Sequence, residues 1–259
     1  MMRIHAHPAC LLHDTGPDHV ERPQRLREVT KALRAAFPAL EWREAPRATR
    51  GQLLRAHAPG LLDLVLETRP ASRLMLDPDT VLSPDSDEAA LRAAGAAAAA
   101  VDAVLVGLDT RVFCAVRPPG HHATRDAAMG FCLFNNIAIA ALHALDAHGL
   151  QRVAIVDFDV HHGNGTQAIF EQDRRVLFAS SHQWPLYPGS GAGNETGAGN
   201  IVNAPLPADA DGTLFRAAHR LRFHALALQR GEQGGVRVDF SGCVLKCRCG
   251  RGSGRTPGS

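Results

Sequence analysis

The segment VDFDVHHGNG, residues 156–165, places carboxylates and imidazoles directly after an apolar run. In an extended chain alternate side chains point to the same side, so we expect Asp157, Asp159 and His161 to project toward one point. Carboxylates at the end of a buried strand are costly unless a cation or hydrogen-bond donors compensate their charge. In the alternative interpretation the aspartates cap a turn or the next helix, and the histidines lie on the surface. The histidine in register with both aspartates favours a metal ion.

A second group of histidines lies in RPPGHHAT, residues 117–124. Two prolines and a glycine exclude regular structure there and give His121 and His122 a rigid loop. We expect adjacent histidines to point in different directions, which suits proton transfer better than joint binding of one ion. Histidine has an unperturbed pKa near neutral pH, and a carboxylate on one ring nitrogen orients the ring and raises its basicity. Alternatively, the pair forms ordinary hydrogen bonds at the surface.

Strands and helices alternate along the chain, and the polar groups follow the strands. The pattern predicts helices over 23–37, in two pieces over 51–67, over 83–108 and 135–149, and from 166, with a polar loop over 77–86. It predicts strands over 111–116, 152–160 and 175–181. This alternation indicates parallel strands with helical crossovers, in which ligands bind outside the carboxyl ends of the strands.

Composition limits the class of protein. A chain of 259 residues with 45% hydrophobic content can bury the core of one α/β domain, and a formal net charge of +2 gives no field that would attract nucleic acid or an anionic membrane. Six unevenly placed cysteines favour a reducing compartment over a disulfide framework. The alanine-rich stretch 93–108 is too short for a membrane span. The opening shows no export signal, so we expect a cytoplasmic location.

Several motifs together resemble the histone deacetylase family, and most closely its bacterial class II-like members and the acetylpolyamine amidohydrolase group. The motifs are ERPQRL, RPPGHHA, GFCLFNNIAIAA, VAIVDFDVHHGNGTQ and SSHQWPLYPGSG, and they occur in the family's order and spacing over residues 1–217. The resemblance implies the arginase–deacetylase fold, a parallel-sheet, three-layer α/β/α architecture. It also implies zinc-dependent hydrolysis of acetyl-lysine-like amides or acetylated polyamines.

The resemblance assigns roles to the two polar segments. Asp159 and His161 match two of three protein ligands of the catalytic metal. His122 matches the general base and acid, and His121 its electrostatic partner. Asp157 matches the carboxylate that orients His121, and Asn164 stands where some relatives have a second orienting aspartate.

Further positions match the substrate channel and an ion site. Gly130, Phe131 and Tyr187 resemble the channel that holds the acyl-lysine stem, although both aromatic residues also suit a core. Ser180, together with Asp157, Asp159 and His161, matches a structural site for a monovalent cation, which the resemblance implies is potassium. For the catalytic ion the donor set favours Zn²⁺ and leaves Fe²⁺, cobalt and manganese open.

The sequence departs from the family pattern after residue 217. The family continues to a Gly-Phe-Asp segment with the third metal ligand and to a Gly-Gly-Tyr whose hydroxyl binds the oxyanion, and neither is present. The remaining residues, 218–259, resemble a divergent or frame-shifted tail that we expect to be disordered, which leaves the domain over 1–217 truncated. Asp239 is the carboxylate nearest the expected place, but its surroundings do not match. Cys243, Cys247 and Cys249 lack a second pair for a zinc site, and the tail's arginines indicate no specific nucleic-acid partner.

Three functions follow for comparison. The first is a zinc-dependent amidohydrolase that removes an acetyl group from acetyl-lysine-like or acetylpolyamine amides. The second is a manganese ureohydrolase of the related fold, which needs more aspartates and histidines than these two segments provide. The third is a catalytically inactive remnant or binding protein without the third metal ligand and the oxyanion tyrosine. The acyl group, the natural substrate and the oligomeric state are not determined by the sequence.

Overall fold

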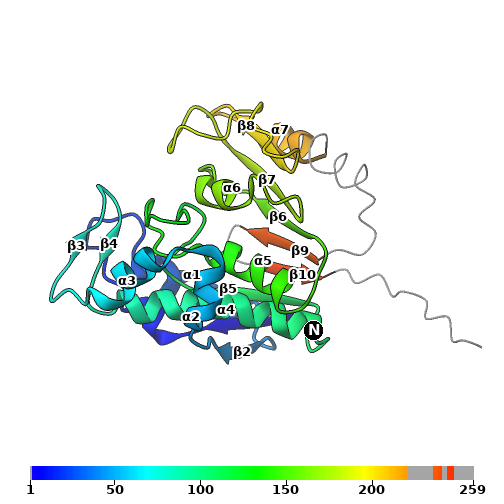
Figure 1. The fold of residues 1–259 in the computed structure, drawn as a ribbon. Coiled ribbons are helices and arrows are strands. Elements are labelled where there is room, and N and C mark those ends of the chain that lie inside the picture. Colours follow the sequence, from blue (N-terminus) through cyan, green and yellow to red (C-terminus); the bar gives the residue numbers. More distant parts are fainter. Residues whose placement is uncertain (1, 221–235, 241–243, 248–259) are drawn as a thin grey trace, which may run out of the picture.

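A central mixed sheet organises the computed structural model, which describes residues 2–220, 236–240 and 244–247 (Figure 1). Its strand order is β2-β1-β5-β10-β9-β6-β7-β8, and every neighbouring pair is parallel except those made by β10. The strands are β1 Met2–Ala6, β2 Glu41–Glu44, β5 Arg111–Ala115, β6 Val153–Asp157, β7 Val176–Gln183, β8 Ile201–Leu206, β9 Val236–Phe240 and β10 Val244–Cys247. A separate hairpin pairs β3 Leu74–Met75 with β4 Val81–Leu82.

Helices cover both faces of the sheet. They are η1 Pro8–Leu11, α1 Pro23–Ala36, α2 Arg50–Ala56, α3 Pro59–Glu67, α4 Ser86–Leu105, α5 Asn136–Asp146, α6 Asn164–Phe170 and α7 Gly212–Ala218. Alternate residues of β5 face opposite layers, because Val112 and Cys114 pack with α4 and α5, whereas Ala115 packs with Leu26 of α1. The expected three-layer α/β/α architecture is therefore confirmed.

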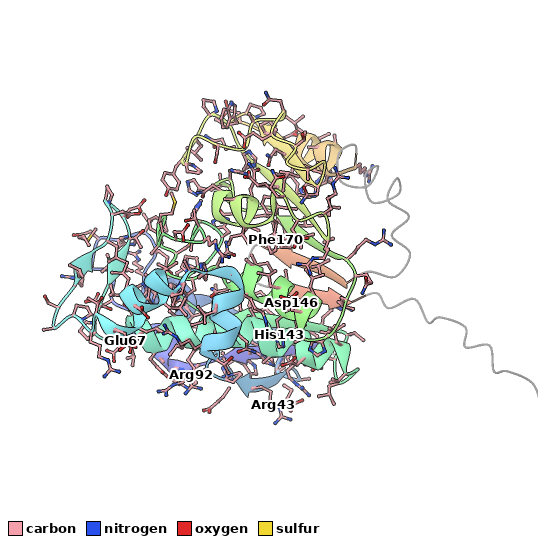
Figure 2. The ribbon with its side chains drawn as sticks, in the orientation of Figure 1. Arg43, Glu67, Arg92, His143, Asp146 and Phe170 are labelled. Carbon is pink, nitrogen blue, oxygen red and sulfur yellow. The ribbon has the colours of Figure 1, made fainter. Side chains whose placement is uncertain are left out.

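The larger core lies on the side of α4 and α5. Alanines make up most of the buried face of α4, and small side chains allow close helix packing against α5. Phe170, at the end of α6, is fully buried in the same core (Figure 2). Within the described part of the chain no helix is both long and apolar enough to cross a membrane.

The structure confirms the main elements and corrects several boundaries. The predicted helices correspond to α1 to α6, and the predicted strands to β5, β6 and β7. Residues 77–86 are not an entirely polar loop, because Val81 and Leu82 form β4 and are buried. Strand β6 ends at Asp157 rather than continuing to residue 160.

The expected disordered tail also needs revision for two segments. β9 and β10 lie between β5 and β6, where β9 continues the parallel pairing of β6. The expected boundary at residue 217 falls inside α7. Cys243 and Cys249 lie outside the described residues.

Candidate active site

The two polar segments of the sequence meet beyond the carboxyl ends of the strands. Residues 117–122 follow β5, and residues 158–163 follow β6. The backbone N–H of Thr166, in α6, donates to the carbonyl of His121 at 3.1 Å and so connects the first segment to the helix that follows the second. A side chain at Gly165 would lie 2.2 Å from the carbonyl oxygen of Ala123, so the contact requires glycine. The predicted location at the strand ends is thus where the histidines and carboxylates gather.

His121 forms a buried pair with Asp157. Its Nδ1 lies 2.9 Å from Asp157 Oδ2, and the two residues are 6% and 1% exposed. Burial lowers the pKa of His121, but the charge and hydrogen bond of Asp157 outweigh burial and raise it. A Cβ at Gly163 would lie 2.3 Å from Asp157 Oδ2. The Asp157 carboxylate therefore fixes the ring of His121, as the resemblance implies for this pair.

His122 has a different partner and the opposite pKa shift. Its Nδ1 lies 2.8 Å from Oδ1 of Asn164, and Asn164 Nδ2 donates to the sulfur of Met129 at 3.4 Å. An amide oxygen only accepts, so Nδ1 carries the proton and Nε2 presents a lone pair. Burial, followed by the neighbouring His121, lowers the pKa of His122 to about 3. The ring is therefore neutral near neutral pH and able to accept a proton.

The two histidine rings do not diverge as expected. Their centroids are 4.0 Å apart and their planes are inclined by 45°. Neighbouring side chains of an extended strand would point to opposite sides, but the loop after β5 is not extended in this way. The rings nevertheless use separate partners, Asp157 and Asn164, so each can keep its own protonation state.

Asp157, Asp159 and His161 are brought together by turns rather than by strand alternation. Asp157 Oδ1 accepts the backbone N–H of Asp159 at 3.1 Å, and Asp159 Oδ1 accepts that of His161 at 2.9 Å. His161 Nδ1 lies 3.4 Å from Asp159 Oδ1, and the His161 ring lies 6.0 Å from that of His122. The aspartates therefore cap turns, as in one interpretation of the sequence, and also lie beside the histidines, as in the other.

Two residues here could hold the metal ion that the resemblance implies. Asp159 and His161 supply one carboxylate oxygen and one imidazole nitrogen, which are zinc-type donors, and their side chains are 43% and 34% exposed. Within the described ranges no third acidic, cysteine or histidine ligand joins them in one group. Asp239 lies on β9 opposite Val156, one register position before the pair Phe240 and Asp157, and its side chain lies outside the description. The two described ligands are of the type that zinc prefers, but a zinc site needs at least one more protein ligand.

A pocket of about 360 Å³ opens beside these groups. His121, His122, Asp159 and His161 line it together with Gly130 and Phe131. The Tyr187 ring stands edge-on to His122, with centroids 5.1 Å apart, and 5.9 Å from His161. Gly130 and Phe131 both have positive φ, at 56° and 69°. The three residues that resemble a substrate channel therefore border the candidate site.

Two further interactions at the pocket were not predicted from the sequence. Glu21 lines the pocket and pairs with the fully buried Arg117, whose Nε and Nη2 donate to its two carboxylate oxygens at 2.6 and 2.7 Å. The His19 ring packs edge-on against Phe131 at 4.8 Å, and its Nε2 lies 3.1 Å from the carbonyl of Asp79. Glu21 and Arg117 each belong to a quoted motif, but only the fold shows that they meet.

Ser180 lies beside the end of β6. It pairs with Asp157 in the register of β6 and β7, and it is fully buried. Its hydroxyl lies 2.9 Å from Nδ1 of His182. The structure thus brings Ser180 next to Asp157, as the predicted monovalent-cation site requires.

These features define an α/β protein with a mostly parallel sheet and a histidine–carboxylate site at the carboxyl ends of its parallel strands. The model of the histone deacetylase domain matches residues 19–229. The solved structure of the HDA15 HD domain is similar, with a TM-score of 0.75 and 39% identity, and the match covers 79% of this chain and 61% of that one. The chain belongs to the histone deacetylase family and has the arginase–deacetylase fold.

Three relatives show the breadth of the family around this chain. The uncharacterized protein slr0245 of Synechocystis is 43% identical over 80% of this chain and 70% of that protein. The histone deacetylase-like amidohydrolase of Pseudomonas aeruginosa is 38% identical over 84% of this chain and 64% of its own length. Polyamine deacetylase HDAC10 of Homo sapiens is 41% identical over 75% of this chain and 32% of its length. The chain thus spans from about a third to about two thirds of these proteins.

Proposed function

We propose that this chain is a zinc-dependent amidohydrolase that removes an acetyl group from an acetylated amine. The observation that carries the proposal is the orientation of His122, whose Nδ1–H is held by Asn164 while Nε2 presents a lone pair in the pocket beside Asp159 and His161. Asp159 and His161 would hold the zinc ion, which would supply Lewis acidity toward the amide carbonyl and toward water.

The chain's own residues then handle the proton. His122 Nε2 accepts a proton from the attacking water and returns it to the leaving amine, a role that suits a neutral imidazole. His121, held by Asp157, provides a hydrogen-bond donor or a positive charge beside it. Neutral amides resist hydrolysis without such assistance, so the proposal depends on these two rings acting together.

The proposed substrate is an acetylated primary amine on an extended alkyl chain, either an acetyl-lysine side chain or an acetylated polyamine. Phe131 and Tyr187 provide apolar surface for the alkyl stem at the edge of the pocket. Relatives named histone deacetylase-like amidohydrolase and polyamine deacetylase support this class of substrate. We further propose a structural potassium ion next to Ser180 and Asp157. We also propose a cytoplasmic location, with which the buried cysteines Cys10, Cys114 and Cys132 agree, because none of them forms a disulfide.

A second candidate is a binding protein of the same family without turnover. Two observations favour it: the described residues supply two metal ligands at this site, and the sequence lacks the Gly-Gly-Tyr motif. The single tyrosine of the chain is Tyr187, which borders the pocket from another segment. Removal of one oxyanion donor costs about 10²- to 10³-fold in rate in other hydrolases.

The direct test compares turnover of two substrates by the purified full chain. A fluorogenic acetyl-lysine peptide and a monoacetylated diamine are incubated with zinc, with iron(II), with manganese and after chelation. We expect slow hydrolysis that chelation removes, zinc restores and His122→Ala abolishes. Hydrolysis at equal rates before and after chelation would contradict the zinc mechanism. No turnover with any metal, while an acetyl-lysine peptide still binds, would instead identify the binding protein.

A further inference from the structure

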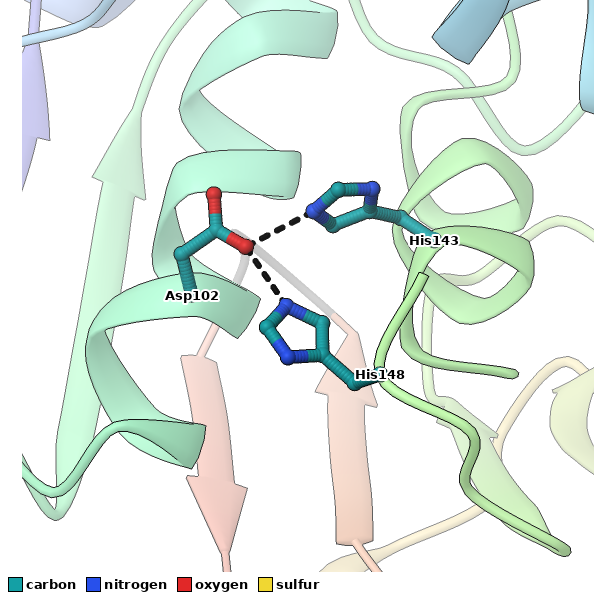
Figure 3. A group of neighbouring side chains, drawn as sticks. All are labelled: Asp102, His143 and His148. Carbon is teal, nitrogen blue, oxygen red and sulfur yellow. Dashed lines mark hydrogen bonds and ion pairs between the residues drawn. The ribbon is translucent and has the colours of Figure 1, made fainter. Parts of the chain in front are cut away.

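We propose that Asp102, His143 and His148 form a second site for a divalent transition-metal ion of the zinc class, separate from the candidate active site. Figure 3 shows the three side chains converging from α4, from α5 and from the segment that follows α5. The Nε2 atoms of His143 and His148 each lie 2.7 Å from Oδ1 of Asp102. The ligand atoms of all three residues lie within 4.8 Å of one another, and no other group of this kind occurs among the described side chains of residues 2–220.

The donor set suits zinc in number and direction. Two imidazole nitrogens and one carboxylate oxygen are a common set of three protein ligands, and water can complete the tetrahedron. The rings of His143 and His148 are 5.3 Å apart and inclined by 87°, so their Nε2 atoms approach the carboxylate from different directions. With metal–ligand bonds of about 2.1 Å, a tetrahedral site separates its ligands by roughly 3.4 Å. The Nε2 atoms, now 2.7 Å from the carboxylate oxygen, would therefore move away from it by about 0.7 Å.

An ion can reach the site from solvent, because two of the three side chains are partly exposed. The Asp102 and His148 side chains are 48% and 25% exposed, while that of His143 is 10% exposed and fixes the inner side of the site. Burial raises the pKa of the Asp102 carboxyl, but the hydrogen bonds from His148 and His143 lower it further than burial raises it. The carboxylate is therefore charged at neutral pH and can neutralise part of the ion's charge.

The site is remote from the pocket. Asn136, the first residue of α5, lines the pocket, whereas His143 lies seven residues further along that helix. At 1.5 Å per residue the separation along the axis is about 10 Å, and His148 lies beyond the end of the helix. An ion here would link the carboxyl-terminal ends of α4 and α5 and would stabilise their packing.

A metal ion at this site competes with the hydrogen bonds that link Arg55, His143 and Asp102. Its Nη1 donates to Nδ1 of His143 at 2.8 Å, and arginine has no acceptor. The proton of neutral His143 must therefore reside on Nε2, where it is donated to Asp102. A metal ion on Nε2 moves that proton to Nδ1, which then faces the Arg55 guanidinium. The ion must displace Arg55, so replacing Arg55 should strengthen metal binding.

The test measures zinc binding to the full chain by competition with a chromophoric chelator. We expect His148→Ala to bind one zinc ion fewer per chain than the unmodified protein. Arg55→Gln should bind this ion about tenfold more tightly, because a glutamine carbonyl can accept the proton on Nδ1 of His143. Arg55→Lys keeps a charged donor and should leave the affinity low. His7→Ala is the matched control, since His7 lies in another part of the fold and accepts a hydrogen bond from Ala9.

Spectroscopy separates this site from the candidate active site. In the ¹⁵N spectrum of the imidazoles, zinc should shift Nε2 of His148 both in the unmodified chain and in a chain with His161→Ala. Unchanged His148 resonances at zinc saturation, or equal zinc content in the unmodified chain and the folded His148→Ala and His148→Gln variants, would refute the site. The proposed hydrolase would be unaffected by that result, because its ligands, Asp159 and His161, are different residues.

Discussion

The ring of His122 occupies space that is free because residue 130 is a glycine. Gly130 has a φ of 56°, and a Cβ there would lie 2.5 Å from the ring of His122. The imidazole is buried on its other sides and is hydrogen-bonded to Asn164, so it has little room to move. Residue 130 therefore needs to be glycine for two reasons: its φ is positive, and any side chain would collide with the proposed base, His122.

Gly130→Ala should reduce turnover far more than it reduces stability. The added methyl group displaces the His122 ring, and misplacement by about 1 Å can cost on the order of 10²-fold in rate. Gly107→Ala is the matched control, because Gly107 also has a positive φ, of 80°, but has open space around its Cβ position. The measurements are kcat and the melting temperature of both variants. Equal losses of kcat in the two variants would contradict the steric explanation.

Asn164→Asp should raise the pKa of His122. The replacement puts a carboxylate where the amide oxygen now lies, 2.8 Å from Nδ1, and an opposite charge at such a distance raises a histidine pKa by about 1 to 3 units. An NMR titration of the imidazole protons reports the shift directly. Asn164→Leu removes the acceptor without adding charge and should not raise the pKa. An unchanged titration of His122 in the aspartate variant would show that Asn164 does not orient this ring.

The local spacing of the sequence was sufficient to predict one group of ligand-type residues. Asp157, Asp159 and His161 lie in one segment, and their backbone turns bring them together even though the strand ends earlier than expected. The pair of Glu21 and Arg117 could not be found in this way. These residues are 96 positions apart, and their contact depends on how the segment before α1 packs against the residues that follow β5. Long-range ion pairs leave no periodic signal in the sequence.

At the scale of elements, His57 connects three parts of the structure around the site. It follows α2 and is fully buried. Its Nδ1 lies 2.8 Å from the carbonyl of Thr124, and its Nε2 accepts the backbone N–H of Asn135 at 2.8 Å, just before α5. Both nitrogens are thus used by a neutral ring with its proton on Nδ1. Protonation would break the bond to Asn135 and disturb the start of α5.

Stability should therefore fall as the pH is lowered from 6.5 to about 4. Burial, the largest cause, lowers the pKa of His57 from 6.5 to about 4, so the unfolded chain binds this proton first. The stabilising contribution is complete above pH 6.5 and is lost as the pH falls toward the folded pKa, with a maximum of about 3 kcal/mol. His57→Ala should lower the melting temperature at pH 7 and flatten its dependence on pH over this range. His7→Ala should keep the slope of the unmodified protein, and an unchanged slope in His57→Ala would contradict the prediction.

Helices were easier to predict than strands for a physical reason. The apolar and alanine-rich positions of α1, α4 and α5 repeat over many residues, whereas β2 is four residues of mixed polarity at the edge of the sheet. An edge strand with exposed side chains lacks both alternation and a continuous apolar run. Strand β8 was hidden by Asn203 and Pro205, which are atypical of strands, although Asn203 is buried and hydrogen-bonded to Gln167.

At the scale of the whole molecule, the order of strands in the sheet differs greatly from their order in the chain. β9 and β10 come last among the strands in sequence, yet they lie between β5 and β6 (Figure 1). Each of these inner strands is paired on both sides. Without them β5 and β6 would each present an unpaired edge, and such edges promote association between chains.

A chain that ends at Arg220 should therefore associate and lose solubility. The variant keeps both polar segments of the candidate site and removes the strands that join the two halves of the sheet. Size-exclusion chromatography coupled to light scattering would show large species where the full chain does not form them. Ending the chain at residue 250, beyond β10, is the matched control and should behave as the full chain. A monodisperse product from the shorter chain would show that β9 and β10 are dispensable.

The central position of β9 and β10 also has a consequence for synthesis on the ribosome. Residues 2–115 and 153–206 emerge first and can assemble the two flanking groups of strands, but nothing closes the gap between them until the segment 236–247 has left the exit tunnel. Until then the nascent chain presents the unpaired edges of β5 and β6 to chaperones. Codons that slow elongation near this segment would prolong that exposure and lower the yield of folded protein.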